Sequence, residues 1–125
     1  AAKVCPYMLK LRCWWQLPGI GRLADELFPV GHVSHATPSE IAITQSAYPD
    51  SIKTAACIPQ IAPTGPIRDA LDFRARFADG RMGSDPLLAS PEKGAKLIAG
   101  AAAALLRDCA EFSAEPFLVE KQGAP

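Results

Sequence analysis

The sequence has no excess of charge of either sign, no C-x-x-C pair, and no apolar run long enough to cross a bilayer. Its 13 basic residues balance 13 acidic ones, which removes the electrostatic argument for nucleic acid or a membrane as a partner. The four cysteines lack the spacing of a zinc ribbon or a redox motif. We therefore expect reduced thiols and a cytoplasmic protein, although an even number of cysteines also permits disulfides.

Two segments have the apolar spacing of amphipathic helices. Residues 20–28 place their large apolar side chains on one face and end before Pro29. Residues 91–112 form the clearest helix, with Ser90 as its N-cap and Pro91 as its first residue. The apolar face predicted for this helix consists of Leu97, Ile98, Ala101, Leu105, Cys109 and Phe112.

Two further features lie between these helices. Thr37, Pro38 and Glu40 have the spacing of a capping box, which predicts a helix that begins after Thr37. Residues 59–86 form a long connection rich in Pro, Gly and Asp, with a short helix expected over residues 69–77. The alternating Arg and Asp side chains of this connection indicate either a solvated, salt-bridged loop or a subunit contact.

Strands are scarce in this pattern. Residues 7–15 and 51–58 are the two strand candidates, and two strands are too few for three or four helices to cover. We therefore expect an α/β fold in which this chain is part of a layered domain and other polypeptide supplies further strands. Residues 1–125 are then a single partial domain, with a flexible tail over residues 113–125.

Four motifs, read together and in this order, resemble the creatininase family of metal-dependent amidohydrolases. They are RCWWQLPGIGRLADELF (12–28), SHATPSE (34–40), IAPTGP (61–66) and GRMGSDPLLASPEKG (80–94). The resemblance covers roughly residues 10–112 and only the C-terminal half of the family domain, because the acidic, His-Gly and Asn-Gly-His-Gly-Gly-Asn motifs of the first half do not occur here. It implies a three-layer α/β/α domain, usually in a homo-oligomer, whose mixed or parallel sheet is incomplete in this chain.

The resemblance implies hydrolysis of a C–N bond in a cyclic or other non-peptide amide. In the full-length family, two divalent cations, zinc or manganese, hold a bridging water and lower its pKa. Most ligands of these ions belong to the half that is missing here. We therefore expect this chain alone to bind no metal and to be inactive, and we expect the N-terminal half or homo-oligomer subunits as partners beside a small-molecule amide substrate.

The resemblance also implies roles for individual residues. His35 is similar to the family histidine that assists proton transfer toward the leaving nitrogen. One of Trp14 and Trp15 is expected to form an aromatic wall over the substrate. Ser34 stands at a substrate-contacting position that is acidic in creatininase itself, which argues against creatinine and favours another amide.

Other interpretations of these residues stay open. Capping of the helix explains Thr37 and Glu40 without catalysis, and a loop histidine packed against a helix start would also explain His35. The H-x-x-H pair of His32 and His35 has no further ligands at a convincing spacing, so we interpret it as a coincidence rather than a zinc site. Two other functions are an assembly module that has lost the metal-binding half and a small binding protein that uses residues 59–86.

Overall fold

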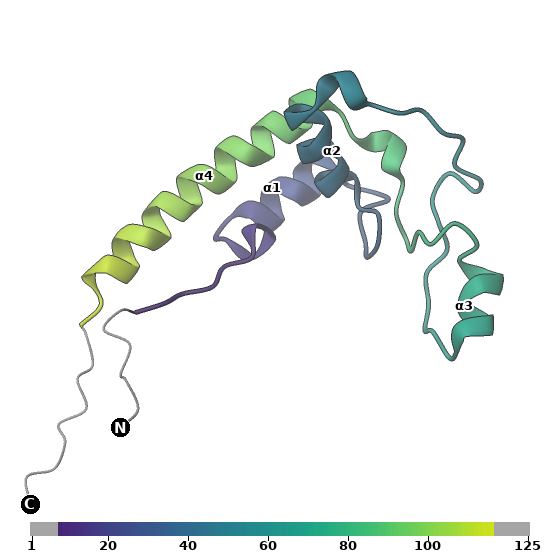
Figure 1. Cartoon of the computed structure of the whole chain (residues 1–125), viewed down its shortest axis with the longest axis horizontal. Helices are drawn as coiled ribbons and strands as arrows, with labels where there is room; N and C mark the ends of the chain where they lie inside the picture. Colours follow the sequence, from purple (N-terminus) through teal and green to yellow (C-terminus); the bar gives the residue numbers. More distant parts are fainter. Residues whose placement is uncertain (1–7, 117–125) are drawn as a thin grey trace, which may run out of the picture.

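The computed structural model describes residues 8–116, and within this range the chain is helical (Figure 1). Its elements are η1 (Trp14–Gln16), α1 (Ile20–Leu27), α2 (Pro38–Ala47), η2 (Pro49–Ser51), α3 (Ala70–Arg76), η3 (Pro86–Leu88) and α4 (Pro91–Ala114), where η denotes a 3-10 turn. All four predicted helices are confirmed, with small differences at their ends. Most of the predicted flexible tail, residues 117–125, lies outside the described residues.

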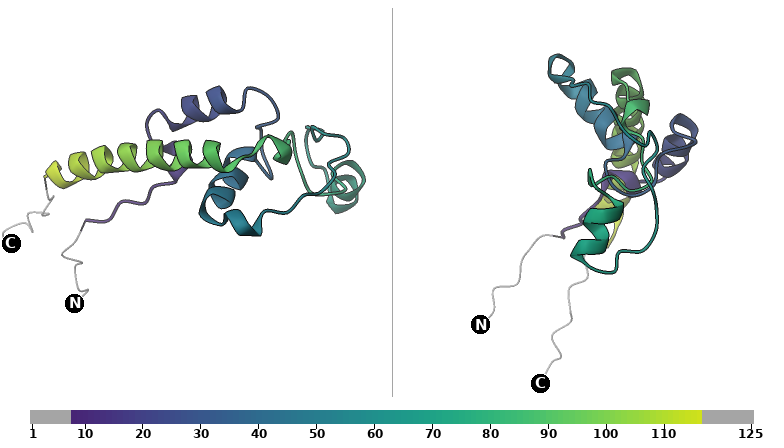
Figure 2. Two further views of the ribbon diagram at one scale, coloured as in Figure 1. Left: turned by 90° about the horizontal axis from the view of Figure 1, so that it is seen from above. Right: turned by 90° about the vertical axis from the view of Figure 1, so that its right-hand side faces the viewer.

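The long helix α4 is the axis of the molecule, and α1 and α2 lie beside it (Figure 2). The Ser90 hydroxyl caps α4 by accepting a hydrogen bond of 3.3 Å from the backbone N–H of Lys93, and Pro91 opens the helix as predicted. Although α4 is long, neither it nor any other helix of residues 8–116 is apolar enough over sufficient length to cross a membrane.

Gly94 allows α2 to lie close against α4. A Cβ at this position would overlap the carbonyl oxygen of Ala42 and would come within 2.9 Å of the Cβ of Ser46. Around this contact, the main apolar cluster consists of Ala24, Phe28, Ala42 and Leu97. The cluster takes residues from α1, α2 and α4 or their ends, and we call these three packed helices the helix layer.

The apolar face predicted for α4 is wrong in part. Ile98 and Leu105 are 42% and 43% exposed, and Cys109 is exposed as well. The neighbouring Asp108 faces the molecule instead, and Arg12 donates two hydrogen bonds of 2.9 Å to its carboxylate. The contact at Gly94 and this ion pair together determine which face of α4 points inward. Neither contact can be predicted from the spacing of apolar residues within one helix.

The expected α/β fold is wrong for this chain. Residues 8–116 contain no strand and no sheet, so they do not form part of a three-layer α/β/α domain. A single antiparallel bridge between His35 and Met82 is the β feature of this range. Both strand predictions, residues 7–15 and 51–58, fail because a strand needs a neighbouring strand to accept and donate its backbone hydrogen bonds.

Residues 8–13 keep the alternation on which one strand prediction rested, but they lie against a helix. The ammonium of Lys10 and the guanidinium of Arg12 reach the Asp108 carboxylate at 3.2 and 2.9 Å. Leu9 and Leu11 are 87% and 92% exposed. The alternation therefore separates side chains that contact α4 from side chains that face solvent.

Residues 59–86, called the loop arm from here on, project beyond the N-terminal end of α4 and carry α3 (Figure 1). The long connection with a short helix is thus confirmed. The side chain of Arg81 is only 6% exposed, and its guanidinium donates to the carbonyl oxygens of Gln60 (2.7 Å), Pro59 (2.8 Å) and Ser84 (3.3 Å). Side-chain bonds to backbone carbonyls therefore close the loop arm on itself.

Candidate functional site

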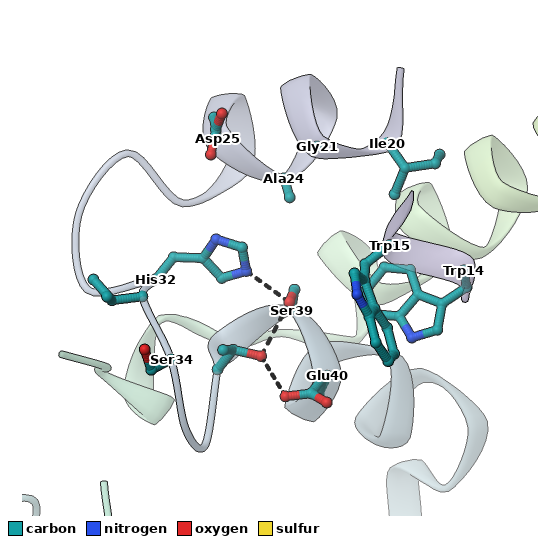
Figure 3. A pocket seen from close by; sticks show the side chains of 12 residues that line it. Trp14, Trp15, Ile20, Gly21, Ala24, Asp25, His32, Ser34, Ser39 and Glu40 are labelled. Carbon is teal, nitrogen blue, oxygen red and sulfur yellow. Dashed lines mark hydrogen bonds between the residues drawn. The ribbon is translucent and has the colours of Figure 1, made fainter. Parts of the chain in front are cut away.

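A hollow of about 400 Å³ lies between α1 and the start of α2 (Figure 3). Trp14 and Trp15 close one end, and the loop of residues 31–36 closes the other. The remaining lining comes from the two helices and consists of Ile20, Gly21, Ala24 and Asp25 on one side and Thr37, Ser39 and Glu40 on the other. The hollow is therefore built entirely from residues 14–40, a single stretch of the chain.

The two tryptophans form the aromatic end of the hollow. Their rings meet edge to face, with centroids 5.8 Å apart and an angle of 89° between the planes. Trp14 also packs against the apolar core, whereas Trp15 is 52% exposed. Packing thus fixes Trp14, and Trp15 is the more accessible of the two rings for a ligand.

Two residues in the left-handed conformation shape the loop at the other end. Gly31 has φ of 64° and its carbonyl accepts a hydrogen bond of 2.9 Å from the backbone N–H of Asp85. A Cβ on Gly31 would come within 2.9 Å of the Asp85 Cβ, so glycine is needed for both reasons. Ala36 has φ of 57°, which costs a side-chain-bearing residue about 1–2 kcal/mol and turns the chain into α2.

The end of the loop arm holds this loop in place. Backbone N–H groups of Ser34 and His35 donate to the Met82 carbonyl at 3.2 and 3.4 Å, and Met82 donates back to His35 at 3.4 Å. The buried hydroxyl of Ser84 donates to the His35 carbonyl at 2.5 Å. The backbone of His35 is therefore fixed while its side chain remains exposed.

A string of four polar side chains runs along the α2 side of the hollow (Figure 3). His32 Nε2 lies 2.7 Å from Ser39 Oγ, which lies 3.2 Å from Thr37 Oγ1. The Thr37 hydroxyl donates to the Glu40 carboxylate at 2.6 Å. The His32 ring is stacked on Phe28, with centroids 5.5 Å apart. The imidazole is thus held both by its face and by one ring nitrogen.

The electrostatics of the hollow favour a neutral imidazole. Burial lowers the pKa of His32 below its ordinary value, and the nearby carboxylates of Asp25 and Glu40 oppose this shift. The lining includes these two carboxylates but no Lys or Arg side chain among the residues that the structure places there. A ligand with hydrogen-bond donors fits this lining better than an anion does.

The structure brings together most of the residues singled out from the sequence. Trp14, Trp15, Ser34, Thr37 and Glu40 line the hollow. His35 is exposed and does not line it. Thr37 is the N-cap of α2 as expected, but its side chain makes no capping bond to the backbone. The capping-box bonds are thus replaced by the bond between the Thr37 and Glu40 side chains.

Sequence reasoning missed three polar side chains of the hollow, namely Asp25, His32 and Ser39. The H-x-x-H spacing of His32 and His35 does not predict the place of His32 in the hollow, and within residues 8–116 the structure adds no further ligands that would make the pair a zinc site. The signal for Ser39 was weak, because a serine near the start of a helix is ordinary. Only the left-handed turns at Gly31 and Ala36 carry His32 back over α2, and these turns are not evident from the sequence.

The described residues do not by themselves fit a metal centre. Across residues 8–116, no three His, Cys, Asp or Glu side chains are gathered so that they could hold an ion. A two-ion hydrolytic site needs several such ligands for each ion. The described residues that line the hollow offer imidazole, hydroxyl, carboxylate and indole groups.

A hollow walled by aromatic rings, with a few polar groups along one side, is typical of a site for a small organic molecule. The family model described as creatininase, creatinine amidohydrolase, matches residues 4–109. Because this match covers most of the chain, the chain belongs to the creatininase family. Membership indicates an amidohydrolase-like function in a family that is generally metal-dependent. No curated protein matches the chain.

Proposed function

We propose that this chain is the C-terminal part of a creatininase-family amidohydrolase and that the hollow between α1 and α2 holds the amide substrate. The main support is that one hollow of about 400 Å³ combines two indole rings with a string of hydrogen-bonding side chains. A cyclic or other non-peptide amide has a flat face and donors and acceptors at its edge. Indole rings cover the face, and hydroxyl, imidazole and carboxylate groups bind the edge.

Individual residues take the following roles in this proposal. Trp15 covers the substrate, because it is the more exposed of the two indoles. Ser34 lines the hollow and offers a neutral hydroxyl that can donate to, or accept from, an amide group. His35 lies outside the lining of the hollow but follows Ser34 directly. In this proposal the scissile bond therefore projects from the hollow past Ser34, where the exposed imidazole of His35 passes a proton to the leaving nitrogen.

The divalent ions of the family, zinc or manganese, are held in this proposal by polypeptide outside this chain. Bound ions supply a hydroxide at neutral pH by lowering the pKa of water. The chain contributes the walls of the substrate site and the proton-transferring imidazole. The isolated chain should accordingly be inactive.

The test compares the isolated chain with a longer polypeptide, encoded by any reading frame that continues upstream of Ala1. We expect the longer polypeptide to bind divalent ions and to hydrolyse at least one cyclic amide in a panel, and the isolated chain to do neither. The substitution His35→Ala in the longer polypeptide should lower kcat by about 10²-fold or more. Stoichiometric metal binding with turnover by the isolated chain would refute its incompleteness, and full activity of the variant would refute the role of His35.

A second function, an assembly module without catalysis, is favoured by one observation. The α4 helix carries the exposed apolar side chains Ile98 (42%), Leu105 (43%) and Leu106 (73%), and such a surface is typical of protein contacts. Light scattering after size exclusion, combined with the assay of amide hydrolysis, distinguishes the two functions. An oligomer that dissociates on Leu106→Ser, with no amide hydrolysis by the longer polypeptide, supports the assembly module, and a monomer argues against it.

A further inference from the structure

We infer that His32 is a fixed hydrogen-bond acceptor of the hollow, and that its Nδ1 accepts an N–H group of the bound ligand. Its Nε2 donates to Ser39, because the hydrogen bonds that run from His32 through Ser39 and Thr37 to Glu40 can have only one direction. The inference rests on the proposed function only for the kind of ligand, an amide that carries an N–H. The direction of the chain follows from the side chains alone.

The direction is set by counting protons from the carboxylate end. The Glu40 carboxylate can only accept, so the single hydroxyl proton of Thr37 is used in the 2.6 Å bond to Glu40. Thr37 must then accept from Ser39 across their 3.2 Å contact. With its own proton used in this way, the Ser39 hydroxyl can only accept from His32, which fixes a proton on Nε2 in the 2.7 Å bond.

The other ring nitrogen of His32 is left free for a ligand. A neutral imidazole with a proton on Nε2 has a lone pair on Nδ1. Within residues 8–116, every side-chain nitrogen or oxygen that is fully buried has a hydrogen-bond partner, and the bond described for the His32 ring is made by Nε2. The Nδ1 atom is therefore accessible, and Figure 3 shows it turned toward α1 across the hollow.

The surroundings of the ring keep it in this state. Three charged groups lie near it: Asp25 on α1, Glu40 on α2, and the Lys93 ammonium from α4, which stands 4.7 Å from the centroid of the Phe28 ring on which His32 is stacked. Burial outweighs the two carboxylates and lowers the pKa of His32. Nδ1 is therefore an acceptor at neutral pH, and its natural partner in this lining is an N–H donor.

The decisive test reads the tautomer of His32 by ¹⁵N NMR of the imidazole side chains. The chain has two histidines, and the exposed His35 serves as the control within each spectrum. We expect the Nε2–H form at His32 in the parent protein. In Thr37→Val, Ser39 loses its acceptor and its hydroxyl turns to donate to Nε2. The ratio of tautomers should shift toward Nδ1–H by roughly tenfold, which corresponds to about 1.4 kcal/mol.

Matched variants make this test specific. Thr44→Val removes a hydroxyl from the same helix that bonds only the Glu40 carbonyl, at 3.0 Å, and should leave the His32 tautomer unchanged. Glu40→Gln replaces a carboxylate that can only accept with an amide that can also donate to Thr37, so it should shift the ratio in the same direction as Thr37→Val but by less. An Nδ1–H form in the parent protein, or equal effects of Thr37→Val and Thr44→Val, would overturn the inference.

The ligand contact is tested with a pair of cyclic amides. Hydantoin carries N–H donors, and 1,3-dimethylhydantoin has the same ring without them. We expect hydantoin to shift the ¹⁵N resonance of His32 Nδ1 and the dimethyl compound to leave it in place. Equal responses to both compounds, or a response of His35 alone, would overturn the assignment of Nδ1 as the acceptor.

The NMR experiment can succeed or fail independently of the proposed function, because it needs neither a metal ion nor turnover. A specific Nδ1 response without amide hydrolysis by the longer polypeptide would refute the hydrolase and leave His32 as an acceptor in a binding site. Hydrolysis by the longer polypeptide without an Nδ1 response would refute only the role of His32.

Discussion

Apolar packing dominates the helix layer, whereas the loop arm, which also buries Phe77, is closed mainly by hydrogen bonds to backbone carbonyls. In the helix layer, buried small and apolar residues such as Ala42 and Leu97 hold the helices together. In the loop arm, the buried guanidinium of Arg81 binds three backbone carbonyls, and the buried Asp85 carboxylate accepts a hydrogen bond of 2.8 Å from Gln60. We therefore expect the arm to open without separating the helices.

The hollow depends on both regions because its loop lies where they meet. Its helical walls and tryptophans belong to the helix layer or pack against it. Its loop is bonded to the end of the arm through Gly31 with Asp85 and through His35 with Met82. Damage to the layer should therefore destroy the hollow, whereas damage to the arm should only loosen one end of it.

The largest effect is expected from Gly94→Ala, which tests the apolar side of this comparison. The new methyl group would overlap the Ala42 carbonyl, so α2 must move away from α4 at a cost of about 3 kcal/mol. Urea unfolding followed by far-UV circular dichroism measures the loss. The control is Gly21→Ala in α1, where no atom lies within 4 Å of the added Cβ. Similar stability of the two variants would show that the close contact does not hold the layer together.

A smaller and local effect is expected from Arg81→Met. The change removes the donors to three carbonyls and should lower the free energy of opening of the loop arm by about 2 kcal/mol. Hydrogen exchange with mass spectrometry should show faster exchange in residues 59–86 and unchanged protection in α4. The exposed Arg74→Met is the control. Faster exchange throughout the helix layer would contradict the independence of the two regions.

The smallest effect is expected from Asp108→Asn, which removes a polar contact between residues 8–13 and α4 of the helix layer. The hydrogen bonds from Arg12, with a further contribution from Lys10, lower the pKa of Asp108 from the ordinary 3.8 to about 2. The ion pair stabilises the folded state fully at pH values above 3.8, the ordinary pKa of the carboxyl group. This stabilisation is lost as the pH falls through about 2. The parent should be more stable than the variant at neutral pH, and the difference should vanish in acid. The effect is modest because the Arg12 side chain is 43% exposed.

The unfolding midpoints of the parent and Asp108→Asn, measured across this acid range, check the prediction. Glu111→Gln, an exposed change on the same helix, is a suitable control and should show no such convergence. A difference that stays constant with pH would show that the ion pair does not stabilise the folded state.

The helices were predictable because their signals are local. Ser90 with Pro91 and Thr37 with Pro38 mark helix starts wherever the rest of the chain lies. The strands predicted over 7–15 and 51–58 are wrong because a strand depends on a partner strand elsewhere. The exposure of Cys109 was predicted wrongly because it depends on the rotation of a whole helix.

Some residues of the hollow could likewise be predicted from the sequence, and others could not. The tryptophans and Ser34 were identified from a family resemblance, and the structure places them together. His32 and Ser39 were not identified, because their 2.7 Å contact exists only after the loop turns at Gly31 and Ala36. Side chains joined by irregular backbone leave no periodic pattern in a sequence.

The central claim, that the hollow between α1 and α2 is where a ligand binds, has a direct measurement. Both tryptophans of the chain line this hollow, so their fluorescence reports a ligand there. We predict a saturable change on titration with hydantoin that is lost in Trp15→Ala. The change should persist in Tyr48→Ala, which alters a neighbouring hollow of about 350 Å³ on α2. Loss of the response in Tyr48→Ala, with Trp15→Ala still responding, would contradict the account.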